Sequence, residues 1–186
     1  KLARDKIAKG GKDVLEAFEH GFKDARIGQY LDFKLKTKPT SISEEEMMQC
    51  YKKYRAVMGT AGRNMALNRK PLGEIFHLGM AKAAESVGCG NEIEDSIKNK
   101  FVKIPSWPLY YSLLTGNVKK GFEITMEKSN LYLNEARLAL ELLPENFSHK
   151  NFLEFLFLTV EHYNIFWFNQ LQKENLWSEF SANLPR

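Results

Sequence analysis

The chain of 186 residues is long enough to bury the core of one domain, and its 44% apolar and 27% charged residues are ordinary for a globular protein. Two cysteines, Cys50 and Cys89, are too few for a disulfide framework, so we expect reduced thiols in an intracellular, cytoplasmic setting. The net charge is +4, but basic residues exceed acidic ones only in residues 1–70. An acidic or phosphate-bearing partner of this half is therefore an alternative to a solvated basic surface.

Apolar residues recur at helical spacing along nearly the whole chain, and no useful length of sequence alternates as a strand does. The first helical segment, 2–22, is interrupted at Gly10 and Gly11, because paired glycines weaken a helix. A second, shorter helix is expected at about 24–35, followed by a loop.

The clearest local signal is Ser43 followed by three glutamates. Ser43 can accept from the first turn and Glu46 can reach back, which is a capping box and predicts a helix over 43–68. We interpret the apolar stripe of this helix as core rather than a cofactor site; it comprises Met47, Cys50, Tyr51, Tyr54, Met58, Ala61 and Met65.

The next helix is expected at 71–87, because Pro71 suits a first turn and Gly88 to Gly90 suit a left-handed stop. A further helix should then occupy about 92–103. A position at a helix end would leave Cys89 exposed and make it the better candidate for a reactive thiol, although a structural role is favoured.

Glu74 and His77 have the E-x-x-H spacing that half of a di-iron site uses on a helix. A helical projection places Glu74 opposite the apolar arc, with Glu85 beside it and His77 on the flank. The sequence contains no second E-x-x-H. We therefore expect surface residues here, and no metal or cofactor.

Trp107 lies between Pro105 and Pro108, at the start of a short predicted helix. With Tyr110 and Tyr111, Trp107 is the first candidate for an exposed anchor that binds a partner. The favoured interpretation of Trp107 itself is a core residue at the end of the bundle.

Two long helices are expected at 118–143 and 148–173, separated by Pro144 and with Ser148 as the cap of the second. Apolar and aromatic residues cover about two thirds of the second helix, so we expect it at the centre of the bundle. It is too polar to span a membrane.

The remaining polar strip of that C-terminal helix includes Glu154, Glu161 and His162. We interpret the strip as a solvent edge. The alternative is that these three side chains line a polar cavity inside the bundle, where burial tunes them.

No acidic residue occurs between Met47 and Gly73, whereas six basic residues do. They spread over several helix faces, so we favour a solvated surface over nucleic-acid or phosphate binding; the six are Lys52, Lys53, Arg55, Arg63, Arg69 and Lys70.

The sequence thus predicts an all-α, single-domain bundle of about six to eight helices, with a more basic segment at 1–40 and the main bundle at 43–186. No catalytic motif is found. The favoured function is a non-enzymatic interaction domain that binds a protein partner. Two alternatives stay open: nucleic-acid or phosphate binding, and a small apolar ligand or metal inside the bundle.

Overall fold

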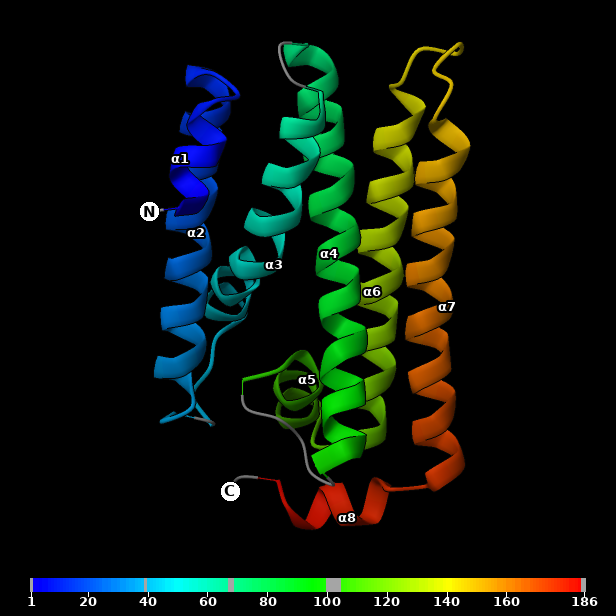
Figure 1. Ribbon diagram of the computed structural model, residues 1–186. Helices are drawn as coiled ribbons and strands as arrows, with labels where there is room; N and C mark the ends of the chain where they lie inside the picture. Colours follow the sequence, from blue (N-terminus) through cyan, green and yellow to red (C-terminus); the bar gives the residue numbers. More distant parts are fainter. Residues whose placement is uncertain (1, 39, 67–68, 100–104, 185–186) are drawn as a thin grey trace.

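The computed structural model describes residues 2–38, 40–66, 69–99 and 105–184. Over these ranges the chain forms helices and no strands, arranged as one bundle (Figure 1), which confirms the predicted all-α fold. The helices are α1 (Leu2–Ala8), α2 (Lys12–Leu35), α3 (Glu44–Met65), α4 (Lys70–Asn99), α5 (Trp107–Thr115), α6 (Val118–Glu141), α7 (Lys150–Glu174) and α8 (Trp177–Ala182).

The predicted interruption at Gly10 and Gly11 is confirmed, since α2 begins directly after Gly11, whose φ is 103°. The predicted break near residue 23 is wrong, because α2 continues through it to Leu35. The helix then packs along α3. The basic N-terminal segment is therefore attached to the bundle through α3.

The capping box of α3 forms as predicted. The backbone N–H of Glu46 donates to Ser43 Oγ at 3.2 Å, and the N–H of Ser43 donates to Glu46 Oε2 at 2.9 Å. The first part of the apolar stripe is core, with Met47 and Cys50 buried. Its later part is not, because Met58 and Met65 are exposed at 40% and 61%.

The predicted stop at Gly88 to Gly90 is wrong, because α4 runs through it as one helix. These glycines serve close packing: a Cβ at Gly88 would lie 3.0 Å from the rings of Tyr51 and Tyr54. Cys89 is consequently buried rather than exposed. The final residues of the predicted 92–103 helix lie outside the described part of the chain.

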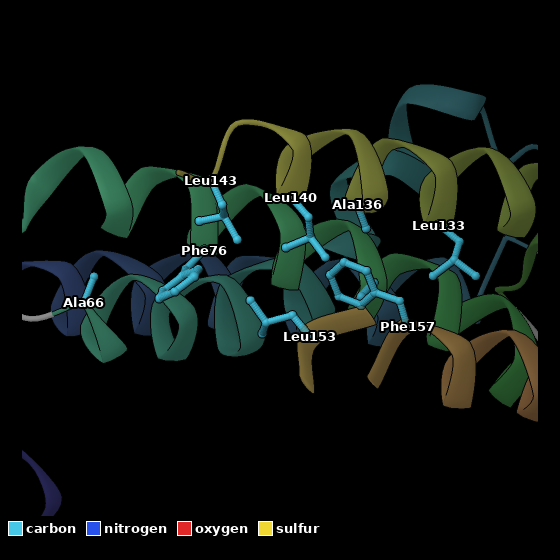
Figure 2. Packing of buried hydrophobic residues seen from close by; sticks show 9 residues of the cluster. Ala66, Phe76, Leu133, Ala136, Leu140, Leu143, Leu153 and Phe157 are labelled. Carbon is cyan, nitrogen blue, oxygen red and sulfur yellow. The ribbon is translucent and has the colours of Figure 1, made fainter. Parts of the chain in front are cut away.

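The central helix is α4, which packs against α3, α6 and α7. One core cluster joins the facing sides of α4, α6 and α7, where Phe76, Leu140 and Phe157 meet (Figure 2). The expectation that the C-terminal helix is central is wrong. In α7 only Leu153, Phe157, Asn164 and Leu171 are buried, because its neighbours α4 and α6 lie on one side.

α5 and α8 lie at the end of the bundle where α4 finishes (Figure 1). α5 ends at Gly116 in the left-handed conformation, with φ 66°, and Asn117 caps α6 by accepting from the N–H of Lys120 at 3.0 Å. α7 begins after His149 without a side-chain cap, so the predicted Ser148 cap is wrong. α8 crosses the end of the bundle and buries Phe180 against Phe122 (Figure 1).

Candidate functional site

An open apolar groove of about 800 Å³ runs between α2, α3, α4 and α7, and we call it the interhelical groove. The α4 residues of its lining include two alanines, Ala83 and Ala84, whereas α3 and α7 contribute larger side chains such as Met58 and Phe157. The groove is lined by Ala25, Arg26, Gln29, Lys53, Tyr54, Val57, Met58, Met80, Ala83, Ala84, Val87, Leu156, Phe157, Thr159 and Val160.

Two apolar side chains of α3 stand exposed at this groove, Val57 at 59% and Met58 at 40%. The charged lining residues are Arg26 and Lys53, both basic. Lys53 Nζ lies 2.8 Å from Asp32 Oδ1, whereas the Arg26 guanidinium lies 6.0 Å from the centre of the Phe22 ring. The groove is therefore apolar with a basic edge.

Beyond the groove, the side of α7 that faces away from the bundle also carries large apolar residues. We call this side the α7 outer face. Its exposed members are Phe152, Phe155, Leu158, Ile165 and Phe166, between 42% and 62% exposed. Clustered apolar surface of this kind is typical of interaction sites. The aromatic residues that the sequence assigned to a central helix thus lie partly in solvent.

Trp107 is fully buried, so the exposed position suggested for it is wrong and its interpretation as core is confirmed. Its ring packs against Tyr51, Tyr110 and Tyr111 with centroids 5.5 to 5.7 Å apart. Its backbone N–H donates to Glu92 Oε2 at 2.9 Å. Tyr110 and Tyr111 are half-buried around it.

The same aromatic cluster holds a cation from the chain itself. Lys128 Nζ of α6 lies 4.1 Å from the centre of the Trp107 ring and 5.6 Å from that of Tyr132. Its charge is paired with Glu44, 3.3 Å away. The aromatic rings therefore bind an internal ammonium group, a favourable cation–π arrangement.

Within the described residues, four of the six basic residues proposed for nucleic acid are ion-paired: Lys53 with Asp32, Arg55 with Glu85, Arg63 with Glu74, and Lys70 with Asp13. The six lie at several sites. Lys52, Arg55 and Arg63 come together at a small hollow between α2, α3 and α4.

We call that hollow the basic pocket. Its volume is about 130 Å³, and its lining residues are Ala17, His20, Gly21, Asp24, Lys52, Arg55, Ala56, Thr60, Arg63 and His77.

Glu154, Glu161 and His162 do not line an internal cavity. Glu154 and His162 are exposed, and Glu161 accepts from Arg137 Nη2 at 2.5 Å. The solvent-edge interpretation is confirmed for Glu154 and His162.

The buried polar residue of α7 is Asn164, which the sequence analysis missed. It lies on the same helical side as Leu153, Phe157 and Leu171, a signal that a projection of α7 contains.

Asn164 belongs to a buried hydrogen-bonded cluster shared by three helices. Its Nδ2 donates to Ser86 Oγ of α4 at 2.9 Å and to Ser129 Oγ of α6 at 2.8 Å. The two hydroxyls are 2.9 Å apart. These bonds satisfy polar groups that burial alone would penalise.

Glu74 is exposed, as predicted, and pairs with Arg63. Glu85, expected beside it, is buried at 1% exposure, because α3 covers that side of α4. Arg55 Nε and Lys82 Nζ lie 3.1 and 3.2 Å from its carboxylate oxygens.

Within the described residues, no group of three or more His, Cys, Asp or Glu side chains is arranged to hold a metal ion.

Both thiols are buried and free. Burial raises the pKa of Cys50 to about 12 and raises the pKa of Cys89 well above its usual range. Tyr51 Oη donates to Cys89 Sγ at 3.8 Å. Because a nucleophilic cysteine needs access and thiolate character, Cys89 is a packing residue.

Comparison of the chain with protein-family models, with curated proteins and with solved structures found no match. In the described part of the chain, no helix combines the length and the apolar character needed to cross a membrane.

Proposed function

We propose that this chain is a non-enzymatic interaction domain that binds a protein partner in the interhelical groove. The partner segment is an amphipathic helix with an acidic residue at one edge. The observation that carries the proposal is the groove itself, an apolar channel of about 800 Å³ whose charged lining residues are both basic. Helix binding in grooves uses apolar anchors at positions i, i+3, i+4 and i+7.

Exposed apolar side chains support this proposal over a purely structural role. Val57 and Met58 stand exposed at the α3 side of the groove, and Leu156 and Val160 of α7 line its other side. Arg26, whose guanidinium lies near the Phe22 ring at the groove, supplies a charge for an acidic residue of the partner. Two buried free thiols suit an intracellular protein.

The test is an unbiased selection of helical peptides from a displayed library against the intact chain. We expect the selected peptides to share an apolar stripe with an acidic edge. In anisotropy measurements, Val57→Asp should weaken their binding by about tenfold or more, because it places a carboxylate in the apolar channel. Arg26→Glu should shift the preference of the chain toward basic peptides.

Leu114→Asp is the matched control, because Leu114 of α5 is 68% exposed and does not line the groove. This variant should bind the selected peptides as the unmodified chain does. Selection of peptides without an apolar stripe, or equal losses in Val57→Asp and Leu114→Asp, would contradict the proposal. A lipid-sized molecule found in the groove by native mass spectrometry would assign it to a small apolar ligand instead.

A further inference from the structure

The basic pocket is separate from the interhelical groove and has the opposite character. Three cationic side chains of α3 line it, Lys52, Arg55 and Arg63, against one carboxylate, Asp24 of α2. Arg55 and Arg63 are each paired with a carboxylate outside the lining, Glu85 and Glu74. The donors of these side chains, rather than an excess of positive charge, are therefore what the pocket offers to a small anion.

The two arginines have donors left after their ion pairs. Arg55 Nε lies 3.1 Å from Glu85 Oε1, and Arg63 Nη2 lies 2.8 Å from Glu74 Oε2. A guanidinium carries five N–H donors in a fixed plane, so each carboxylate fixes the orientation of the group without using all its donors.

One of these remaining donors is buried. Arg63 Nε is inaccessible to solvent and has no hydrogen-bond partner among the described residues. A buried donor without an acceptor is costly, and a charged donor more so. An oxyanion in the basic pocket would supply the missing acceptor.

Two glycines shape the pocket by letting its walls come close. A Cβ at Gly21 of α2 would lie 1.9 Å from Thr60 Oγ1, and one at Gly59 would lie 2.8 Å from His77 Cε1. Each glycine therefore makes room for a polar side chain of the lining. The hydroxyl of Thr60 and the imidazole of His77 reach the pocket as a result.

We propose that the basic pocket binds a phosphate group, either as free inorganic phosphate or as the terminal group of a phosphomonoester. A volume of about 130 Å³ exceeds that needed for one water and suits a group of five heavy atoms, with any attached carbon skeleton outside. Arg63 Nε–H, the second arginine and Lys52 are the donors, and Thr60 Oγ adds a neutral hydrogen bond. This site goes beyond the proposed groove function and stands independently of it.

The test uses inorganic phosphate and glycerol phosphate as separate probes, with glycerol as the neutral control, in calorimetric titrations at low ionic strength. We expect saturable binding of at least one phosphate probe to the unmodified chain. Arg63→Gln should weaken it by about tenfold or more, because charge-assisted hydrogen bonds are strong. Tighter binding of inorganic phosphate would identify free phosphate as the ligand, and tighter binding of glycerol phosphate a phosphomonoester.

Arg137→Gln is the matched control, because Arg137 has a similar exposure to Arg63, also pairs with one glutamate, and lies on α6 away from the pocket. It should leave binding unchanged. Asp24→Asn should tighten binding several-fold, since it removes the carboxylate of the lining, and loss of folding cannot mimic a gain. Absence of binding for both phosphate probes, or equal weakening by Arg63→Gln and Arg137→Gln, would overturn the proposal.

Discussion

Gly90 of α4 and Asn164 of α7 lie so close that a Cβ on Gly90 would be 2.0 Å from Asn164 Oδ1. The contact allows Asn164 to reach Ser86 and Ser129 with its amide nitrogen. A polar side chain buried on α7 therefore fixes how that helix sits on α4 and α6. The glycine that resembled a helix stop in the sequence is a packing site.

Gly90→Ala is expected to destabilise the chain by about 1–3 kcal/mol, because the methyl group would displace Asn164 and break its hydrogen bonds. Gly79→Ala is the control in the same helix. Its Cβ would meet ordinary contacts at 3.5 Å or more, so the higher helix propensity of alanine should leave it neutral or stabilised. Urea denaturation of both variants checks the prediction; equal effects would contradict it.

Glu85→Gln is expected to lower the free energy of unfolding by about 1–3 kcal/mol. The variant keeps the size of the side chain but leaves Arg55 and Lys82 beside a neutral group at a buried position. Glu74→Gln, which breaks the exposed pair with Arg63, should cost less than about 1 kcal/mol. A smaller loss for Glu85→Gln than for Glu74→Gln in urea titrations would show that burial of the carboxylate is unimportant.

Both thiols are expected to resist a disulfide reagent at pH 8 in the folded chain and to react once urea unfolds it. Burial raises the pKa of Cys50 to about 12 and that of Cys89 above its usual range. The stability linked to these raised pKa values is fully present below the thiol pKa of the unfolded chain, about 8.5, and is lost as pH rises toward the folded values.

The urea concentration at the unfolding midpoint should consequently decrease as the pH is raised from about 9 to about 11. The pKa of Tyr51, raised by burial, acts in the same direction. Rapid labelling of either thiol under native conditions would contradict the buried positions of Cys50 and Cys89.

Lys128→Met is expected to destabilise the chain by about 0.5–2 kcal/mol and to change the fluorescence of Trp107, because it removes an ammonium group 4.1 Å from the centre of the indole ring. Lys120→Met serves as the control on the same helix, since Lys120 is half-exposed and pairs with Glu123 at 3.5 Å. An unchanged emission spectrum in Lys128→Met would argue against the cation–π contact.

Local signals in the sequence were sufficient for several parts of the fold. The capping box at Ser43 and Glu46 and the break at Gly10 and Gly11 both formed, because each depends on backbone geometry within a few residues. Helical spacing alone likewise predicted the all-α class.

The candidate sites were less accessible to sequence reasoning. Lys52, Arg55 and Arg63 were recognised as basic residues, but their meeting at one pocket depends on how α2 and α4 pack on α3. Trp107 could be an anchor or a core residue until its neighbours were placed. The groove combines four helices, and no single segment of the chain contains it.

The sequence by itself determined which segments are helical and where several of them begin, since those properties are local. Only the tertiary structure decided which side of each helix is covered. Glu85 became buried because α3 lies over it, and the aromatic residues of α7 stayed partly exposed because α7 has neighbours on one side. The same glycine can end a helix or admit a neighbouring side chain, and at Gly90 the position of Asn164 decides between them.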